Sequence, residues 1–166
     1  MMQREKIVAY THTETMEPSS ALALGAYILL LIATVPQLPV STVPVAVVVA
    51  AYIFSVVRVA TSESNPETSR RCARAARLCY VTYFLLKLVC PLPWHWYDVL
   101  GVLVVVLPQG SQPWHAIVAA YYVASIAAYA KKGQHLQVTA RSMLLIASLM
   151  NAQSLKVPAD EEGEGL

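Results

Sequence analysis

Four apolar stretches constrain the fold of this chain more than any other feature of its sequence. They are Ala21–Val35, Val43–Val57, Leu78–Cys90 and Trp94–Leu107. Helical runs of about 14–17 residues reach roughly 21–25 Å at about 1.5 Å per residue, whereas the hydrocarbon core of a bilayer is about 30 Å thick. A helix that falls short must thin the membrane, draw in its flanks, or enter as part of a shallow hairpin. The sequence therefore predicts short helical hairpins in a membrane.

The composition favours a membrane protein over a soluble domain. Hydrophobic residues make up 57% of the 166 residues and charged residues 13%, so the chain is more apolar than an ordinary soluble protein. The net charge of +2 is too small to indicate a nucleic-acid partner. We expect an all-α, polytopic integral membrane protein whose immediate partners are membrane lipids.

Two further segments and the chain ends complete the expected organisation. A fifth, apolar helix is expected at Trp114–Ala130. The segment Val138–Ala152, which Arg141 interrupts, is expected to be a C-terminal interfacial helix. The predicted organisation is a polar N-terminal segment at 1–17, a single helical membrane domain at 18–156 with about four short hairpin helices, and a disordered acidic tail at 157–166.

Proline, asparagine and glycine mark the expected helix ends. The first helix is expected to begin near Pro18, and Asn65–Glu67 supplies an N-cap, a first-turn proline and a first-turn acid. Pro91–Pro93 predicts a sharp turn after the third apolar stretch. Lys131–Gly133 is typical of a helix stop.

Basic residues predict the orientation, because they concentrate in cytoplasmic loops. Placing the basic clusters on one side requires two hairpins whose tips, Pro36–Ser41 and Cys90–Pro93, point away from the cytoplasm. The fifth helix must then stay shallow or re-enter, since a full crossing would carry Lys131 and Lys132 to the far side. Four arginines at helical spacing are candidates for binding anionic headgroups, or for setting the topology alone: Arg70, Arg71, Arg74 and Arg77.

Aromatic and small residues predict contacts with the membrane interface and between helices. Trp and Tyr concentrate where the bilayer meets water, and small residues at four-residue spacing allow helices to approach closely. Chance accounts for part of any alanine stripe in so alanine-rich a segment. The candidate interface anchors are Trp94, Trp96, Tyr97 and Trp114, and the candidate packing residues are Ala116, Ala120, Ala124 and Ala128.

Few residues indicate chemistry. A metal site at His95, Asp98 and His115 can be imagined, but polar residues are routine at helix starts, so no metal or other cofactor is expected. The sequence has no phosphate-binding loop or nucleophile elbow, so no enzymatic activity is expected. The ionisable residues near the apolar segments lie close to helix ends and are expected to reach the headgroups: Arg58, Arg77, Lys87 and Asp98.

Part of the chain resembles a known family. A helix end at Ala51–Arg58 leads into the polar segment Ser62–Thr68, and an apolar helix is followed by Leu92–Tyr97, a further short helix and Leu107–Gln109. This order resembles the receptor expression-enhancing and Yop-type family of endoplasmic reticulum shaping proteins, over roughly a third of the chain. The resemblance implies short hairpins that bend the bilayer. The chain departs from the family in its arginine-rich loop and in the apolar helix that follows the second hairpin.

Three functions are weighed. The leading hypothesis is an endoplasmic reticulum protein, acting as a homo-oligomer, whose short hairpins occupy more area in one leaflet and favour curvature. The alternative is an accessory structural subunit that joins other membrane subunits, for instance in the mitochondrial inner membrane. A small channel or transporter ranks third, because it needs full crossings and a polar group at mid-depth. Cys72, Cys79 and Cys90 form an odd set that indicates free thiols in a reducing compartment.

Overall fold

The structure, a computed structural model, describes residues 16–37, 42–90, 93–109 and 111–154. Throughout these residues the regular structure is helical, which confirms the all-α expectation. The expected tip residue Pro91 and the expected tail at 157–166 lie outside the described residues, as does most of the N-terminal segment. The elements are α1 (Pro18–Thr34), the 3-10 turn η1 (Val35–Gln37), α2 (Thr42–Ala60), α3 (Pro66–Val89), α4 (Asp98–Val106), α5 (Gln112–Lys131) and α6 (His135–Ser154).

The helix ends follow the local signals in the sequence. Pro18 lies in the first turn of α1, where its missing N–H costs nothing. The side chain of Asn65 accepts a hydrogen bond from the Thr68 N–H at 3.0 Å and so caps α3. Gly133 has a φ of 67° directly after α5, a backbone conformation that glycine adopts without steric penalty. These three expectations are confirmed.

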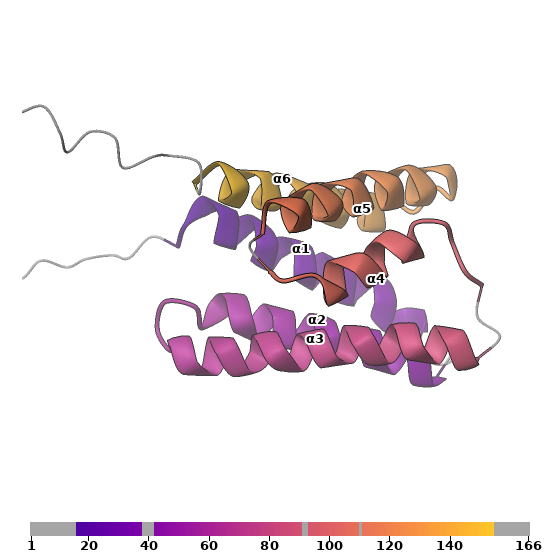
Figure 1. Ribbon diagram of the computed structural model, residues 1–166, viewed down its shortest axis with the longest axis horizontal. Helices are drawn as coiled ribbons and strands as arrows, with labels where there is room; N and C mark the ends of the chain where they lie inside the picture. The colour runs from indigo at the N-terminus through magenta and orange to yellow at the C-terminus, as the bar shows by residue number, and fades with distance from the viewer. Residues whose placement is uncertain (1–15, 38–41, 91–92, 110, 155–166) are drawn as a thin grey trace, which may run out of the picture.

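The six described helices form a closed arrangement that we call the helical ring. Each helix packs against the next one along the chain, and α6 returns to pack against α1. In Figure 1, α5 and α6 lie along one side of the molecule and α2 and α3 along the opposite side, with α1 and α4 between them. Successive helices run in opposite directions, so α1 begins and α6 ends at the same end of the ring.

The two ends of the ring carry different residues. The 61–65 loop and the first turns of α3 lie at one end, which we call the arginine-rich end because Arg70, Arg71 and Arg74 are exposed there. Residues 93–97 and 132–134 lie at the other end, the far end. Lys132 Nζ is 3.3 Å from His95 Nε2, which joins these two segments. The lysines after α5 therefore lie at the opposite end from the arginines.

The helices are longer than the apolar stretches from which they were predicted. Apart from α4, they contain 17 to 24 residues, or roughly 26–36 Å at about 1.5 Å per residue. Polar flanks supply the difference, since α3 takes in the whole segment from Pro66 to Arg77. Two spans, Pro18–Gln37 and Val43–Ala60, are long and apolar enough to cross a membrane. The predicted shortfall is therefore wrong for α1 and α2.

The fourth helix differs from its prediction at its start. It begins at Asp98 rather than Trp94 and has nine residues. The Asp98 carboxylate accepts a hydrogen bond from the His95 N–H at 2.7 Å, which holds residues 95–98 in a turn instead of a helix. Gly101 then lets α4 approach α3 closely, because a Cβ at this position would lie 2.6 Å from the Phe84 ring.

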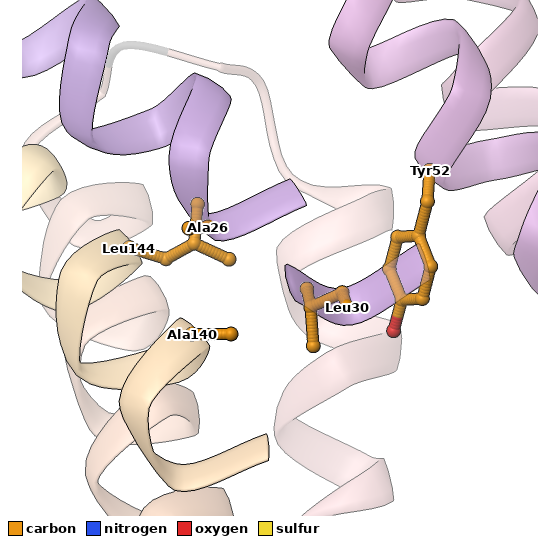
Figure 2. Close-up of a cluster of buried hydrophobic side chains, with 5 residues drawn as sticks. All are labelled: Ala26, Leu30, Tyr52, Ala140 and Leu144. Carbon is orange, nitrogen blue, oxygen red and sulfur yellow. The ribbon is translucent and has the colours of Figure 1, made fainter. Parts of the chain in front are cut away.

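Small side chains bring α1 and α6 together. Ala26 and Ala140 have no exposed surface, and Leu30 and Leu144 pack beside them. Figure 2 shows these four residues facing one another, with the ring of Tyr52 from α2 approaching Leu30. Close packing of this kind replaces hydrophobic burial where helices associate in lipid.

The surroundings of α6 differ from those expected for an interfacial helix. It packs along both α1 and α5 and buries Ala140, Leu144 and Ala147 together with Gln137 and Arg141. The buried residues of α6 form one face against the ring, so this helix is more deeply packed than expected of an interfacial helix. Arg141, which was expected to interrupt the segment, lies in the interior.

Apolar side chains cover much of the outside of the ring. Large aliphatic residues such as Ile32, Leu85 and Val123 are exposed, whereas the buried residues include serines, a threonine and charged groups. Among the described residues, the largest side chain with under 2% exposure is that of Ser125. The described structure therefore combines many exposed aliphatic side chains with several buried polar groups among the buried apolar ones.

Candidate functional site

A cavity of about 330 Å³ lies inside the helical ring. All six described helices contribute to its lining. The exposed polar residues of the lining lie at the arginine-rich end, so the cavity opens there, and we call it the vestibule. These residues are Arg58, Ser62, Arg77, Gln109 and Asn151.

Tyrosines dominate the walls of the vestibule. They come from four helices, and Phe84, Leu30 and Val118 fill the space between them. The rings of Tyr27 and Tyr52 are 6.4 Å apart between centroids, and Tyr52 and Tyr80 are equally close in an edge-on arrangement. The walls therefore offer apolar ring faces together with phenolic hydroxyl groups. The five tyrosines are Tyr27, Tyr52, Tyr80, Tyr121 and Tyr122.

A buried arginine lies on the vestibule. Arg141 is only 6% exposed, and its guanidinium carbon lies 4.1 Å from the centroid of the Tyr129 ring. Its Nη1 donates a hydrogen bond to the side-chain oxygen of Gln137, while its Nε has no hydrogen-bond partner in the described structure. Among the described residues that line the vestibule, none is acidic. The guanidinium therefore carries a buried positive charge without a lining carboxylate to neutralise it.

A second buried polar group faces the same space. Both ring nitrogens of His115 are buried without a hydrogen-bond partner in the described structure, and the residue lines the vestibule. Neighbouring Trp114 is fixed, because its indole N–H donates to the Val104 carbonyl at 2.9 Å. Buried polar groups are normally hydrogen-bonded, so unpaired ones at a cavity indicate a place where a ligand or water supplies the partner.

The far end contains a buried ion pair. Lys87 Nζ lies 2.6 Å from Asp98 Oδ2, and each residue is 5% exposed. The Trp94 indole N–H donates to the Lys87 carbonyl at 3.0 Å, which covers the pair. Sequence reasoning placed both charges in the headgroups. That expectation is wrong, because the turn at residues 95–98 brings the carboxylate to the lysine.

Aromatic residues connect the far end to the vestibule. Tyr97 is buried, and its ring centroid lies 6.4 Å from that of Tyr121 and 6.5 Å from that of Tyr129. Tyr129 in turn lies under the Arg141 guanidinium. Tyr97 was predicted as an interface anchor, and its burial between α4 and α5 corrects that prediction. Trp96 is 68% exposed, as an anchor requires.

The remaining candidate residues are spread over the surface. All four predicted headgroup arginines are exposed. Arg71 pairs with Glu67, and Arg77 donates to the Val105 and Val106 carbonyls at 2.9 and 3.3 Å, so it caps α4. Of the alanine stripe on α5, Ala124 is buried and Ala128 half-buried, while Ala116 and Ala120 are exposed.

The imagined metal site does not form a cluster in the described residues. His95 lies beside Asp98, with Nδ1 3.7 Å from Oδ2, whereas His115 lies on the vestibule. No group of three or more His, Cys, Asp or Glu side chains suited to a metal occurs in the part of the chain that the structure describes. The three cysteines are free and half-buried.

Sequence reasoning missed the vestibule. Its buried charged residue, Arg141, was noticed only as an interruption of a weak apolar segment, and its tyrosines are scattered over four helices. A signal was present, since an arginine within a helix of a membrane protein usually marks a functional interior. No protein-family model, curated protein or solved structure matches this chain.

Proposed function

We propose that this chain is an integral membrane protein that binds a small solute in the vestibule, which is open to one side of the membrane. The observation that supports this function is a polar, positively charged cavity within a ring whose outer surface is apolar. An intramembrane ionisable residue is costly, so it is kept where it serves binding or transport. Arg141 fits this description, because it lies about two turns inside α6.

The surface supports placement in a bilayer. Lipid tails solvate exposed side chains such as Ile32 and Val123, whereas water would not. The antiparallel order of the helices would then give repeated crossings by the longer helices, with α1 beginning and α6 ending at one side. The helices α3, α5 and α6 are less apolar than α1 and α2 because they carry the charges at both ends and the polar groups of the interior.

Access to the vestibule can be measured with engineered cysteines. In a variant with Cys72, Cys79 and Cys90 replaced by serine, Ser148→Cys reports on the vestibule and Ile32→Cys on the apolar surface. The protein is reconstituted in sealed vesicles, and a membrane-impermeant thiol reagent is supplied on one side. Glu63→Cys and Gln134→Cys, exposed at opposite ends of the ring, serve as references for the two sides.

The proposal makes a definite prediction for this experiment. Ser148→Cys reacts from the side that labels Glu63→Cys and is protected from the side that labels Gln134→Cys. Ile32→Cys reacts from neither side because lipid covers it. Reaction of Ile32→Cys, or equal reaction of Ser148→Cys from both sides, would contradict a membrane-embedded vestibule with one opening.

Membrane shaping is the second candidate function, and α4 favours it. With nine residues, α4 extends only about 14 Å, so it reaches less than halfway through a hydrocarbon core. An uneven ring of this kind would occupy unequal areas in the two leaflets. Reconstitution tests the idea: smaller vesicles or tubules at high protein-to-lipid ratio support it, and unchanged spherical vesicles count against it. The endoplasmic reticulum location and the family resemblance stay predictions.

A further inference from the structure

We propose that the ligand of the vestibule is a small organic monoanion, with one carboxylate that binds Arg141 and a flat apolar body that packs against the tyrosines. This inference rests on the proposed function and names the class of solute. Its basis is the combination of one buried, unneutralised guanidinium with aromatic walls.

The surroundings of Arg141 favour the binding of an anion. Its contacts with Tyr129 and Gln137 supply ring electrons and one amide oxygen, and neither carries a full negative charge. A planar guanidinium matches a carboxylate with two parallel N–H···O bonds, and such charged hydrogen bonds are about twice as strong as neutral ones. The unpartnered Nε is one of the donors that a carboxylate would use.

The charge count favours a monoanion. Arg141 is the buried cation on the vestibule in the described structure, while Arg58 and Arg77 are exposed at its opening. Arg77 is already bound to the carbonyl groups at the end of α4. Exposed arginines attract anions toward the opening, but solvent and salt screen them. A dianion would bring a second negative charge into the interior without a buried partner.

The walls define the rest of the ligand. Tyrosine rings and Phe84 offer flat faces, and Leu144 adds apolar surface beside Arg141. A cavity of about 330 Å³ lies at the lower end of the roughly 300–1,000 Å³ range of small-molecule sites. His115 offers one donor and one acceptor for a polar substituent on the body. Benzoate combines these properties and is a suitable probe.

Calorimetric titration of the full-length protein in nanodiscs of neutral lipid tests the charge requirement. Benzoate is compared with benzamide, which has the same shape without the charge. Because the guanidinium recognises the carboxylate, we expect benzoate to bind at least about tenfold more tightly. Arg141→Gln should remove this preference, Arg141→Lys should retain part of it, and Arg70→Gln, which removes an exposed arginine, should leave it unchanged.

Other outcomes overturn the inference. Equal affinity for benzoate and benzamide in the natural protein excludes charge recognition, and this comparison needs no variant that might misfold. Retained benzoate binding by folded Arg141→Gln excludes Arg141 as the anion site. In nanodiscs that contain an anionic lipid, loss of benzoate binding would assign the same chemistry to a lipid headgroup, whereas unchanged binding supports a free solute.

Protection of the engineered cysteine separates this inference from the proposed function. Ser148 lines the vestibule, where benzoate is proposed to bind. Benzoate should therefore slow the labelling of Ser148→Cys, whereas benzamide should not. One-sided labelling that benzoate does not affect would keep the vestibule and reject the monoanion. Two-sided labelling would reject the proposed function itself.

Discussion

At the scale of single residues, three charged side chains of the described structure lie in the interior. Lys87 and Asp98 neutralise each other, whereas Arg141 relies on an aromatic ring and an amide. A buried ion pair adds little stability over apolar packing, but breaking it leaves an unpaired charge. The Lys87–Asp98 contact therefore fixes the geometry of the turn before α4.

Asp98→Asn should destabilise the protein by about 3–5 kcal/mol, because it leaves Lys87 without its carboxylate partner in a buried site. Thermal unfolding in detergent, followed by circular dichroism, measures the loss. The double variant Lys87→Met with Asp98→Asn should recover much of it, since the unpaired charge is gone. Glu67→Gln breaks an exposed pair and should change stability by less than about 1 kcal/mol. An equal effect of both single variants would contradict the burial of the pair.

Interactions between residues that are close in the sequence could be predicted from it. Contacts between residues that are distant in the sequence could not. The cap at Asn65 and the stop at Gly133 depend on hydrogen bonds and backbone angles within a few residues. The partner of Lys87 lies 11 residues away beyond a turn, and the environment of Arg141 is made by other helices. Hydrophobic patterning carries no information about such contacts.

At the scale of elements, the helices were located correctly. The apolar stretches are shorter than the helices that contain them, except that α4 is shorter than predicted. Apolar runs mark where a helix meets lipid or other helices, while the helix itself continues through polar residues until a cap or a proline ends it. The start of α3 at Pro66 follows this rule. The predicted start of α4 was wrong. The expected first helical residues form a turn instead, which a hydrogen bond to the Asp98 carboxylate stabilises.

Gly101→Val tests the close contact between α3 and α4. The added side chain meets the Phe84 ring, so we expect a loss of about 1–3 kcal/mol. Combining it with Phe84→Leu should restore part of the stability, measured by the same thermal unfolding. Gly133→Ala meets no neighbouring atom but strains a φ of 67°, so Phe84→Leu should not rescue it. Failure of the rescue at Gly101 would contradict the contact.

At the scale of the whole molecule, closure of the ring depends on α6. Pairing was expected between neighbouring apolar stretches, and α1 does pack against α2 and α3 against α4. The contact between α1 and α6, which joins the first and last described helices, was not expected. That contact relies on alanines, which the sequence contains in many places. Composition therefore indicated a helical membrane protein, while the enclosed cavity required knowledge of which alanines face each other.

Ala140→Phe tests ring closure. The residue has no exposed surface, so a large side chain should push α6 from α1 and cost about 1–3 kcal/mol or more. Ser148→Cys should also react with the thiol reagent equally from both sides of the membrane. Ala120→Phe places the same side chain at an exposed position on α5 and should leave both measurements unchanged. A change in oligomeric state with Ala120→Phe would instead assign the alanine stripe to a contact between copies.

The antiparallel course of the ring has one more consequence. The helices α1 and α6 pack together, and α1 begins at the end of the ring where α6 ends. The same ring could therefore form from a chain that begins at a different helix. A short linker between residues 16 and 154 and new termini at the turn after α5 would give a circular permutant in which every helix keeps its two neighbours in the ring. Such a permutant should fold with both new termini displaced to the opposite side of the bilayer.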